Sequence, residues 1–517
     1  MIDSTSPSPS TGPATTKDAE DAARRQRERV EKYLGQAPVA ASGAVTVDAG
    51  RLEYRSVAEF LPVRAGGIEA RRGDPEAAVF TTAYVVGDDA LRPVCFAFNG
   101  GPGSASIWLH LGALGPKRVV VPDDARMPLP PFEVSDNPLT WLRHFDLVFV
   151  DPPHTGWSIS VDDDTRKKHL SVDGDAAAIA DVIEGWLTRH RRWGAPVFVA
   201  AESYGTTRAA ALADRLLDAG VALAGLVLVS CAMDLQALVF APRNDLPYAL
   251  FLPAFANTAQ YHGRLKGTPG ASSDAARAAA EAFVADDYLA ALHAGARLDG
   301  ARRSRVVRRL AELTGLPRGL VERRNLRIDD ETFFVELLRD QGRIVGRLES
   351  RSTGPMAARQ RTDWEFDPGI DAIAAPYTSA ALRYFTEGLG LHEGAQAGQR
   401  YEVLSLDAHR RWDWNRKGEG GEPQRGNAFA STSDDLSRAL RRQPHLRVLV
   451  ASGRYDLGTP YSASDWSLAQ LDVPPEVRAR VTHRYYDAGH MMYTREADLR
   501  RLATDLADWV ETVLARA

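Results

Sequence analysis

Cysteine is scarce in this sequence, which has two, Cys95 and Cys231, among 517 residues. Both lie in or beside apolar runs, so we expect small buried side chains rather than a disulfide framework. No run of about 18 apolar residues occurs, and the N-terminal residues lack the apolar core of a secretion signal. The sequence therefore predicts a cytoplasmic protein without a membrane span.

An excess of charge of either sign is also missing. Lys and Arg total 63 against 68 for Asp and Glu, which gives a formal net charge of −5. This balance provides no long-range attraction to nucleic acid or to an anionic membrane. The metal patterns HExxH and CxxC and the dinucleotide fingerprint GxGxxG are absent. We therefore expect no metal, no other cofactor and no nucleic-acid or membrane partner, and no feature indicates an oligomeric state.

Changes in hydrophobic pattern divide the chain into four predicted parts. These are a disordered leader over 1–20, a first core part over 21–235, a helical cap over 236–400 and a second core part over 401–517. Strand-like apolar runs alternate with helical patterns in the core parts, at 94–98, 146–151, 197–200, 226–229, 446–450 and 481–486. This alternation favours βαβ units, and hence an α/β class with a mostly parallel sheet flanked by helices.

The segment Ala201-Glu202-Ser203-Tyr204-Gly205 lies between an apolar run and a helical pattern. This is the context of a nucleophile elbow, in which a sharp turn exposes a serine hydroxyl. The first elbow position is Ala201 rather than the usual Gly. Taken alone, the pattern fits equally well a serine that caps a helix after a strand. Residues elsewhere in the sequence therefore decide between a nucleophile and a helix cap.

Asp456 and His490 are the candidate partners of Ser203, because each follows an apolar run in the second core part. Both are predicted at the carboxyl ends of parallel strands, where open α/β sheets place their sites. A serine nucleophile needs an imidazole that takes its proton and a carboxylate that orients the imidazole. The chain order Ser, Asp, His is the one expected for an α/β-hydrolase fold. We therefore predict that fold, with a triad of Ser203, His490 and Asp456.

A glycine-rich loop, Asn99 to Gly103, follows the apolar run 94–98. Acyl transfer needs donors that stabilise the oxyanion, commonly the backbone N–H after the nucleophile and one from such a loop. Tyr204 and Gly101 are the predicted donors. A phosphate-binding loop is disfavoured because no Gly-Lys-Ser/Thr follows.

Together these motifs resemble the serine carboxypeptidase family, and most closely its bacterial members. The matching stretches are 99–103, Leu114-Gly115-Pro116, Asn137-Pro138 with Trp141, 149–151, 155–158, 202–205, 453–456 and 489–491. The resemblance implies cofactor-free removal of C-terminal residues, so that the partner is a peptide with a free C-terminus. It also implies that Asn99, Gly100 and Glu202 bind the substrate, with Asn99 and Glu202 on its terminal carboxylate. Glu202 donates to a carboxylate only when it is protonated.

Three positions depart from the family's pattern. Ala97 stands where the family usually has Trp, Ala113 where it has a second Glu, and Ser104 where it has Cys. Loss of one acid from a coupled pair predicts a more neutral pH optimum. Weaker recognition of the carboxylate keeps two alternatives open, a carboxypeptidase-like esterase or acyltransferase. The third alternative is a non-catalytic binding protein on a hydrolase fold.

Overall fold

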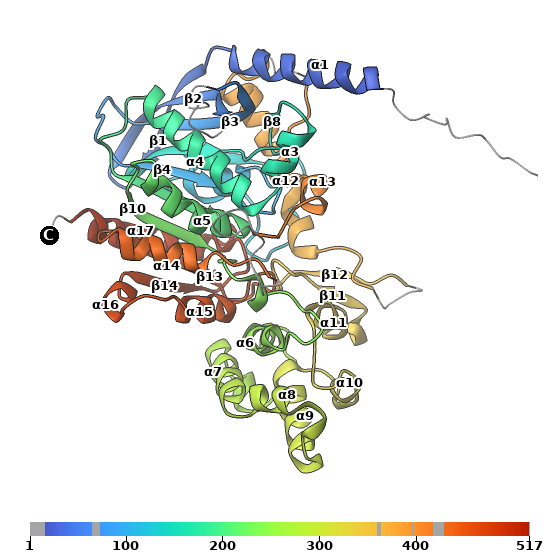
Figure 1. Ribbon diagram of the computed structural model, residues 1–517. Coiled ribbons are helices and arrows are strands. Elements are labelled where there is room, and N and C mark those ends of the chain that lie inside the picture. The colour runs from blue at the N-terminus through green and yellow to red at the C-terminus, as the bar shows by residue number, and fades with distance from the viewer. Residues whose placement is uncertain are drawn as a thin grey trace, which may run out of the picture.

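A ten-stranded sheet runs through the computed structural model, which describes residues 16–64, 73–358, 363–394, 396, 398–416 and 429–515 (Figure 1). Nine strands follow one another across it in the order β1 (Val39–Val47), β2 (Gly50–Arg64), β3 (Pro75–Val85), β7 (Asp146–Val150), β4 (Val94–Phe98), β9 (Val197–Glu202), β10 (Leu223–Val229), β13 (Arg447–Gly453) and β14 (Val481–Tyr486). The short β8 (Ile159–Ser160) pairs with β3. From β7 to β14 every pairing is parallel, whereas β1, β2 and β3 pair antiparallel.

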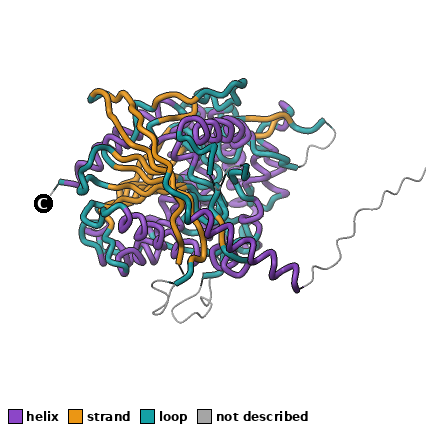
Figure 2. Tube along the Cα trace, turned by 90° about the horizontal axis from the view of Figure 1, so that it is seen from above, coloured by secondary structure: helices purple, strands orange, loops and turns teal. Residues whose placement is uncertain are grey.

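Helices cover both faces of the parallel strands, which explains their continuous apolar sequences. In β4, Phe96 and Phe98 face one core and Cys95 and Ala97 the other. The first core includes helices α4 (Val172–Arg189), α5 (Tyr204–Asp218) and α14 (Ser433–Arg442). The second includes α1 (Thr16–Leu34), α2 (Ile107–Leu109), α12 (Pro368–Arg383) and α17 (Glu496–Leu514). Seen from above, the strands form one continuous layer beside these helices (Figure 2).

A separate group of helices lies below the sheet in Figure 1. It consists of α6 (Leu246–Tyr261), α7 (Ser273–Phe283), α8 (Leu289–Ala294), α9 (Gly300–Thr314), α10 (Arg318–Arg323) and α11 (Asp330–Glu336). These helices bury apolar side chains in one cluster, to which Val345, Leu457 and Tyr461 also belong, whereas α12 packs against the core of the sheet. The cap and the other domain boundaries stay predictions. Of the predicted leader, residues 1–15 lie outside the described residues, and α1 begins at Thr16.

The remaining elements are short and lie outside the main sheet. They are α3 (Asp163–His169), α13 (Leu406–Arg410), α15 (Tyr461–Ala469), α16 (Pro475–Arg478), and the strand pairs β5 (Lys117–Val119) with β6 (Val134–Asp136) and β11 (Arg343–Val345) with β12 (Thr353–Pro355). No helix in the described part of the chain combines the length and apolar composition that a membrane span requires. The cytoplasmic location stays a prediction.

A buried ion pair joins α4 to α5 beneath the carboxyl ends of the strands. Arg208 Nε donates to Asp175 Oδ2 over 2.7 Å, and both side chains are 1% exposed. Arg208 Nη1 also donates to the backbone oxygen of Asn99 over 2.8 Å. The pair therefore fixes the loop after β4 as well as the two helices.

Replacing Asp175 by Asn should destabilise the fold by about 3–5 kcal/mol, because the buried Arg208 loses its counter-charge. The matched control is Asp164→Asn, which removes an exposed ion pair with Lys167 of 3.1 Å. That change should cost about 0–1 kcal/mol. Urea unfolding measures both, and equal unfolding midpoints for the two variants would contradict this account of Asp175.

Candidate active site

The register of β4 and β9 brings the glycine-rich loop beside the elbow. Phe98, the last residue of β4, pairs with Ala201 of β9. The next residues in the two chains, Asn99 and Glu202, are therefore neighbours, and Asn99 Nδ2 donates to Glu202 Oε1 over 2.9 Å. Parallel pairing thus unites two motifs that lie about a hundred residues apart in sequence.

Ser203 occupies a sharp turn between β9 and α5. Its backbone has φ 61° and ψ −132°, a combination that non-glycine residues rarely adopt. Small neighbours permit the turn, because a Cβ built on Gly205 would lie 3.1 Å from the backbone oxygen of Phe98. A strained serine between a strand and a helix is the geometry of a nucleophile elbow.

The glycine-rich loop lies directly against the start of α5. A Cβ built on Gly100 would come 2.5 Å from the backbone nitrogens of both Tyr204 and Gly205, so only glycine fits there. Gly101 follows with φ +101°, which also favours glycine. The two predicted oxyanion donors, Gly101 and Tyr204, therefore come from segments in contact.

Asp456 and His490 meet beyond the ends of β13 and β14, which are adjacent in the sheet. His490 Nδ1 lies 2.7 Å from Asp456 Oδ2, and both residues are buried. Asp456 also accepts from the backbone nitrogens of Gly458 and Thr459 and from the Thr459 hydroxyl. This fixes the ring, and Nε2 is the nitrogen left for a reaction partner.

Burial and pairing act in opposite directions on this His–Asp pair. Burial alone would lower the pKa of His490, but the Asp456 carboxylate outweighs it and the pKa lies above its ordinary value. Burial alone would raise the pKa of Asp456, but the charge and hydrogen bond of His490 hold it below its ordinary value. Each residue therefore stabilises the charged form of the other, as a base that accepts a proton requires.

Glu202 is the other titratable group beside Ser203. Burial raises its pKa to about 7, against the opposing effects of His490, Tyr493 and Asn99. Tyr493 donates its hydroxyl to Glu202 Oε2 over 2.7 Å, while Asn99 donates to Oε1. A carboxyl group with a pKa of about 7 changes its charge at neutral pH.

One cavity of about 290 Å³ collects these groups, since Asn99, Gly101, Glu202, Ser203 and His490 all line it. Apolar side chains make up much of its walls, and polar or charged residues complete them: Trp108, Leu348, Trp364, Ile370, Leu404, Leu406 and Met491, with Ser104, Arg347, Asp367 and His409. The predicted residue Gly100 lines it as well, and so does Thr459, which donates a hydrogen bond to Asp456. Six of the eight predicted site residues thus line one space, while Asp456 and Tyr204 are not among its lining residues.

Sequence patterns missed a segment that connects the His490 and Asp456 loops. Leu348 O accepts from His490 N over 2.7 Å, and Arg347 O accepts from Leu457 N over 2.9 Å. This segment follows β11 and was assigned only to the predicted cap. Tyr493, three residues after His490, was missed too, because no motif marks a hydrogen bond to a residue 291 positions away.

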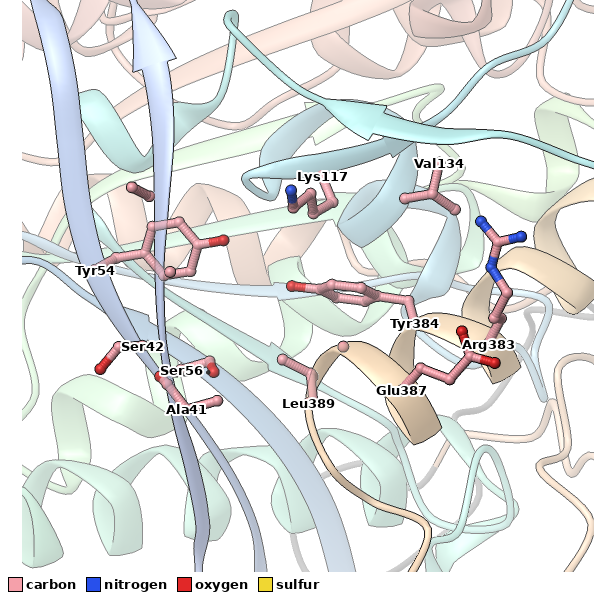
Figure 3. A pocket seen from close by; sticks show the side chains of 13 residues that line it. Ala41, Ser42, Tyr54, Ser56, Lys117, Val134, Arg383, Tyr384, Glu387 and Leu389 are labelled. Atoms are coloured by element: carbon pink, nitrogen blue, oxygen red, sulfur yellow. Dashed lines mark hydrogen bonds between the residues drawn. The ribbon is translucent and has the colours of Figure 1, made fainter.

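A larger cavity, of about 440 Å³, lies elsewhere, between β1, β2 and the turn after α12. Figure 3 shows the hydroxyls of Tyr54 and Tyr384 pointing toward each other across it, with Lys117 nearby and Arg383 to one side. None of the predicted catalytic or binding residues lines this cavity. The chemistry of the motifs therefore makes the smaller cavity the candidate active site.

The described residues contain no group of three or more His, Cys, Asp or Glu side chains that could hold a metal ion. At the site, Glu202 is hydrogen-bonded to Asn99 and Tyr493, and Asp456 is hydrogen-bonded to His490 and Thr459. The chemistry that this arrangement supports is nucleophilic attack by a serine assisted by a histidine.

Comparisons with known proteins agree with these observations. A family model described as serine carboxypeptidase matches residues 80–236, which contain both the glycine-rich loop and the elbow. The predicted resemblance is confirmed over this part of the chain. No curated protein matches the sequence.

Two solved structures are similar to this chain to different degrees. Kex1Δp, a prohormone-processing carboxypeptidase from Saccharomyces cerevisiae, is 13% identical over 88% of this chain and 91% of its own, with a TM-score of 0.53. A putative aryl esterase from Burkholderia cenocepacia is 12% identical over 92% of this chain and 100% of its own, with a TM-score of 0.37. The likeness to the first structure confirms the predicted α/β-hydrolase fold. Fold and family match together support a hydrolase function.

Replacing Tyr493 by Phe should raise the pKa of Glu202 further, because the ionised carboxylate loses a hydrogen bond. A bond to a charged group contributes about 1.5 kcal/mol or more, which corresponds to about one pH unit. Infrared difference spectra across pH follow the protonated carboxyl band, identified by its loss in Glu202→Gln. An unchanged midpoint in Tyr493→Phe would contradict the role given to this hydrogen bond.

Proposed function

We propose that this protein is a serine-type carboxypeptidase, which hydrolyses the C-terminal residue from peptides through an acyl-enzyme. The observation that carries the proposal is the common cavity. The strained Ser203, the His490–Asp456 pair and the Asn99–Glu202 pair all meet there. A nucleophile, its base and a group suited to a carboxylate are the parts that this reaction needs.

In the first half of the proposed reaction, Ser203 Oγ attacks the carbonyl carbon of the last peptide bond. His490 Nε2 takes the hydroxyl proton, and Asp456 stabilises the resulting imidazolium. The backbone N–H groups of Gly101 and Tyr204 stabilise the oxyanion. The C–N bond then breaks, and the leaving amine receives the proton from His490. In the second half, water activated by His490 hydrolyses the ester bond to Ser203.

The proposed carboxylate site is formed by Asn99, Gly100 and Glu202. Glu202 donates to the substrate's carboxylate only in its protonated form, and its pKa of about 7 keeps that form populated at mildly acidic pH. The ascending limb of the pH profile is set by His490, which must be neutral to act as a base. A protonated Glu202 and a neutral His490 are both required, so the pH optimum of peptide hydrolysis should lie near neutrality rather than in strong acid.

A second candidate is an esterase or acyltransferase that uses the same triad. Two buried residues favour it, because neither Ala97 nor Ala113 offers a side-chain group for a carboxylate. This candidate places Ser203 and His490 in the same roles but predicts no preference for a free terminal carboxylate. Substrate comparison therefore separates the two functions.

The test compares N-blocked dipeptides that carry a free C-terminal acid with their amides and esters. The carboxypeptidase proposal predicts that the free acid has the highest kcat/KM, and that Ser203→Ala lowers activity by at least about 10⁴-fold. Hydrolysis of the ester alone would favour the second candidate. A control variant, Ser304→Ala, removes a hydroxyl from the exposed face of α9 and should leave all rates unchanged.

The preference for the free acid should also depend on pH. As the pH rises through about 7, Glu202 loses its proton and the ratio of acid to ester kcat/KM should fall. In Glu202→Gln the side chain stays neutral at every pH, so the ratio should become flat. Profiles of kcat/KM for the acid and the ester, measured from pH 4 to 8, check this prediction. A sharp maximum of kcat/KM for the free acid below about pH 5 would contradict it.

A further inference from the structure

Arg347 is held beside the triad by its own backbone. Its N–H donates to Asp367 Oδ1 over 3.0 Å, and its carbonyl oxygen accepts from Leu457 N over 2.9 Å. Leu457 directly follows Asp456, and the next residue in the segment, Leu348, accepts from the backbone of His490. The loop that carries Arg347 is therefore attached to both loops that carry the base and its partner.

Arg347 lines the same cavity as Ser203 and His490. Its Cζ lies 3.5 Å from the position that a Cβ on Gly458 would take. Within the described ranges of the chain, this guanidinium makes no hydrogen bond and no ion pair within 4.0 Å. The nearby arginines differ, since Arg351 pairs with Glu349 and Arg343 donates to Thr353.

Two acidic groups face Arg347, and both are engaged elsewhere. Asp367 accepts from the backbone nitrogens of Arg347, Leu348 and Gly369, so its oxygens hold the turn before α12. Asp330 accepts from the backbone nitrogen of Glu331. The field of Arg347 reaches both carboxyl groups and also opposes protonation of His490. The five donors of the guanidinium nevertheless remain available to a ligand.

The surroundings make such a ligand bind well. Trp364, Leu348 and Ile370 are apolar side chains that line the same cavity as Arg347. A carboxylate that enters this partly apolar space pairs with a guanidinium more strongly than it does in water. The planar fork of arginine also fits a carboxylate in bidentate geometry, which a lysine cannot do.

We propose that Arg347 binds an acidic side chain of the substrate, so that the enzyme prefers peptides with Asp or Glu next to the scissile bond. The inference rests on the proposed function, since it assigns the terminal carboxylate to Asn99 and Glu202 and a second carboxylate to Arg347. The acidic residue is either the one released or the one before it. Both carry the same chemistry, and the substrates below distinguish them.

The experiment measures kcat/KM for N-blocked dipeptide acids with Glu or Gln at each position. In the wild type, Glu should exceed Gln by at least about tenfold at one position, since hydrogen bonds to charged groups contribute about 1.5 kcal/mol or more. Arg347→Gln should lower kcat/KM for that Glu substrate about 10- to 100-fold, mainly through KM, and leave the Gln substrate nearly unchanged. The control Arg305→Gln removes an exposed arginine of α9 and should change neither rate.

Reversing the charge adds a gain of function that a folding defect cannot imitate. Arg347→Glu should prefer Lys over Glu at the same position, in contrast to the wild type. Equal losses on the Glu and Gln substrates in both Arg347 variants would overturn the proposal. A loss on every free acid, but not on the corresponding amides, would also overturn it, because Arg347 would then bind the terminal carboxylate.

A binding measurement keeps this inference separate from the peptidase proposal. N-acetylglutamate should slow the labelling of Ser203 by a fluorophosphonate in the wild type more than N-acetylglutamine does. In Arg347→Gln the two compounds should be equal. If this result is found while no peptide is cleaved, Arg347 binds acidic side chains and the carboxypeptidase proposal fails. Equal protection by both compounds in the wild type would overturn the assignment of Arg347.

Discussion

Parallel pairing of β4, β9, β10, β13 and β14 is the constraint on which the site depends. Side chains that follow parallel strands collect at one edge of a sheet. The pairing of Phe98 with Ala201 brings Asn99 to Glu202, and β13 beside β14 brings Asp456 to His490. A shift in either register would separate these partners. The apolar runs that fill both cores therefore also determine the geometry of the chemistry.

The buried charged and titratable side chains are the second feature on which the site depends. Each such group at the site has a partner that determines its state: Arg208 has Asp175, His490 has Asp456, and Glu202 has two neutral donors. A charged partner and a neutral partner have different effects. The members of an ion pair keep their charges, whereas Glu202, which is held by neutral donors, has a pKa of about 7. Arg347 stands apart, since within the described ranges it lines the cavity without an ion pair. A substrate that carries a carboxylate would supply the partner that the described residues do not.

Much of this arrangement could be predicted from the sequence, and the reasons for success and failure are physical. Apolar runs report burial directly, so the six predicted strand ranges, from 94–98 to 481–486, coincide with β4, β7, β9, β10, β13 and β14. The strands β1, β2 and β3 were not predicted by range. Contacts between distant segments leave no such pattern. The hydrogen bond of Tyr493 to Glu202 spans 291 residues. The segment around Arg347 contacts the triad loops through backbone hydrogen bonds and through the Glu349 side chain, which accepts from Gly489 N. Such contacts depend on the folded path of the chain.

The most direct test of the account is whether Ser203 is an activated nucleophile. A fluorophosphonate probe, followed by peptide mapping in a mass spectrometer, reports the site and the rate of labelling. The account predicts labelling on Ser203 that is lost in Ser203→Ala and slowed at least about a hundredfold in His490→Ala. Labelling at another residue, or none in the folded wild type, would contradict it and favour a binding protein on a hydrolase fold.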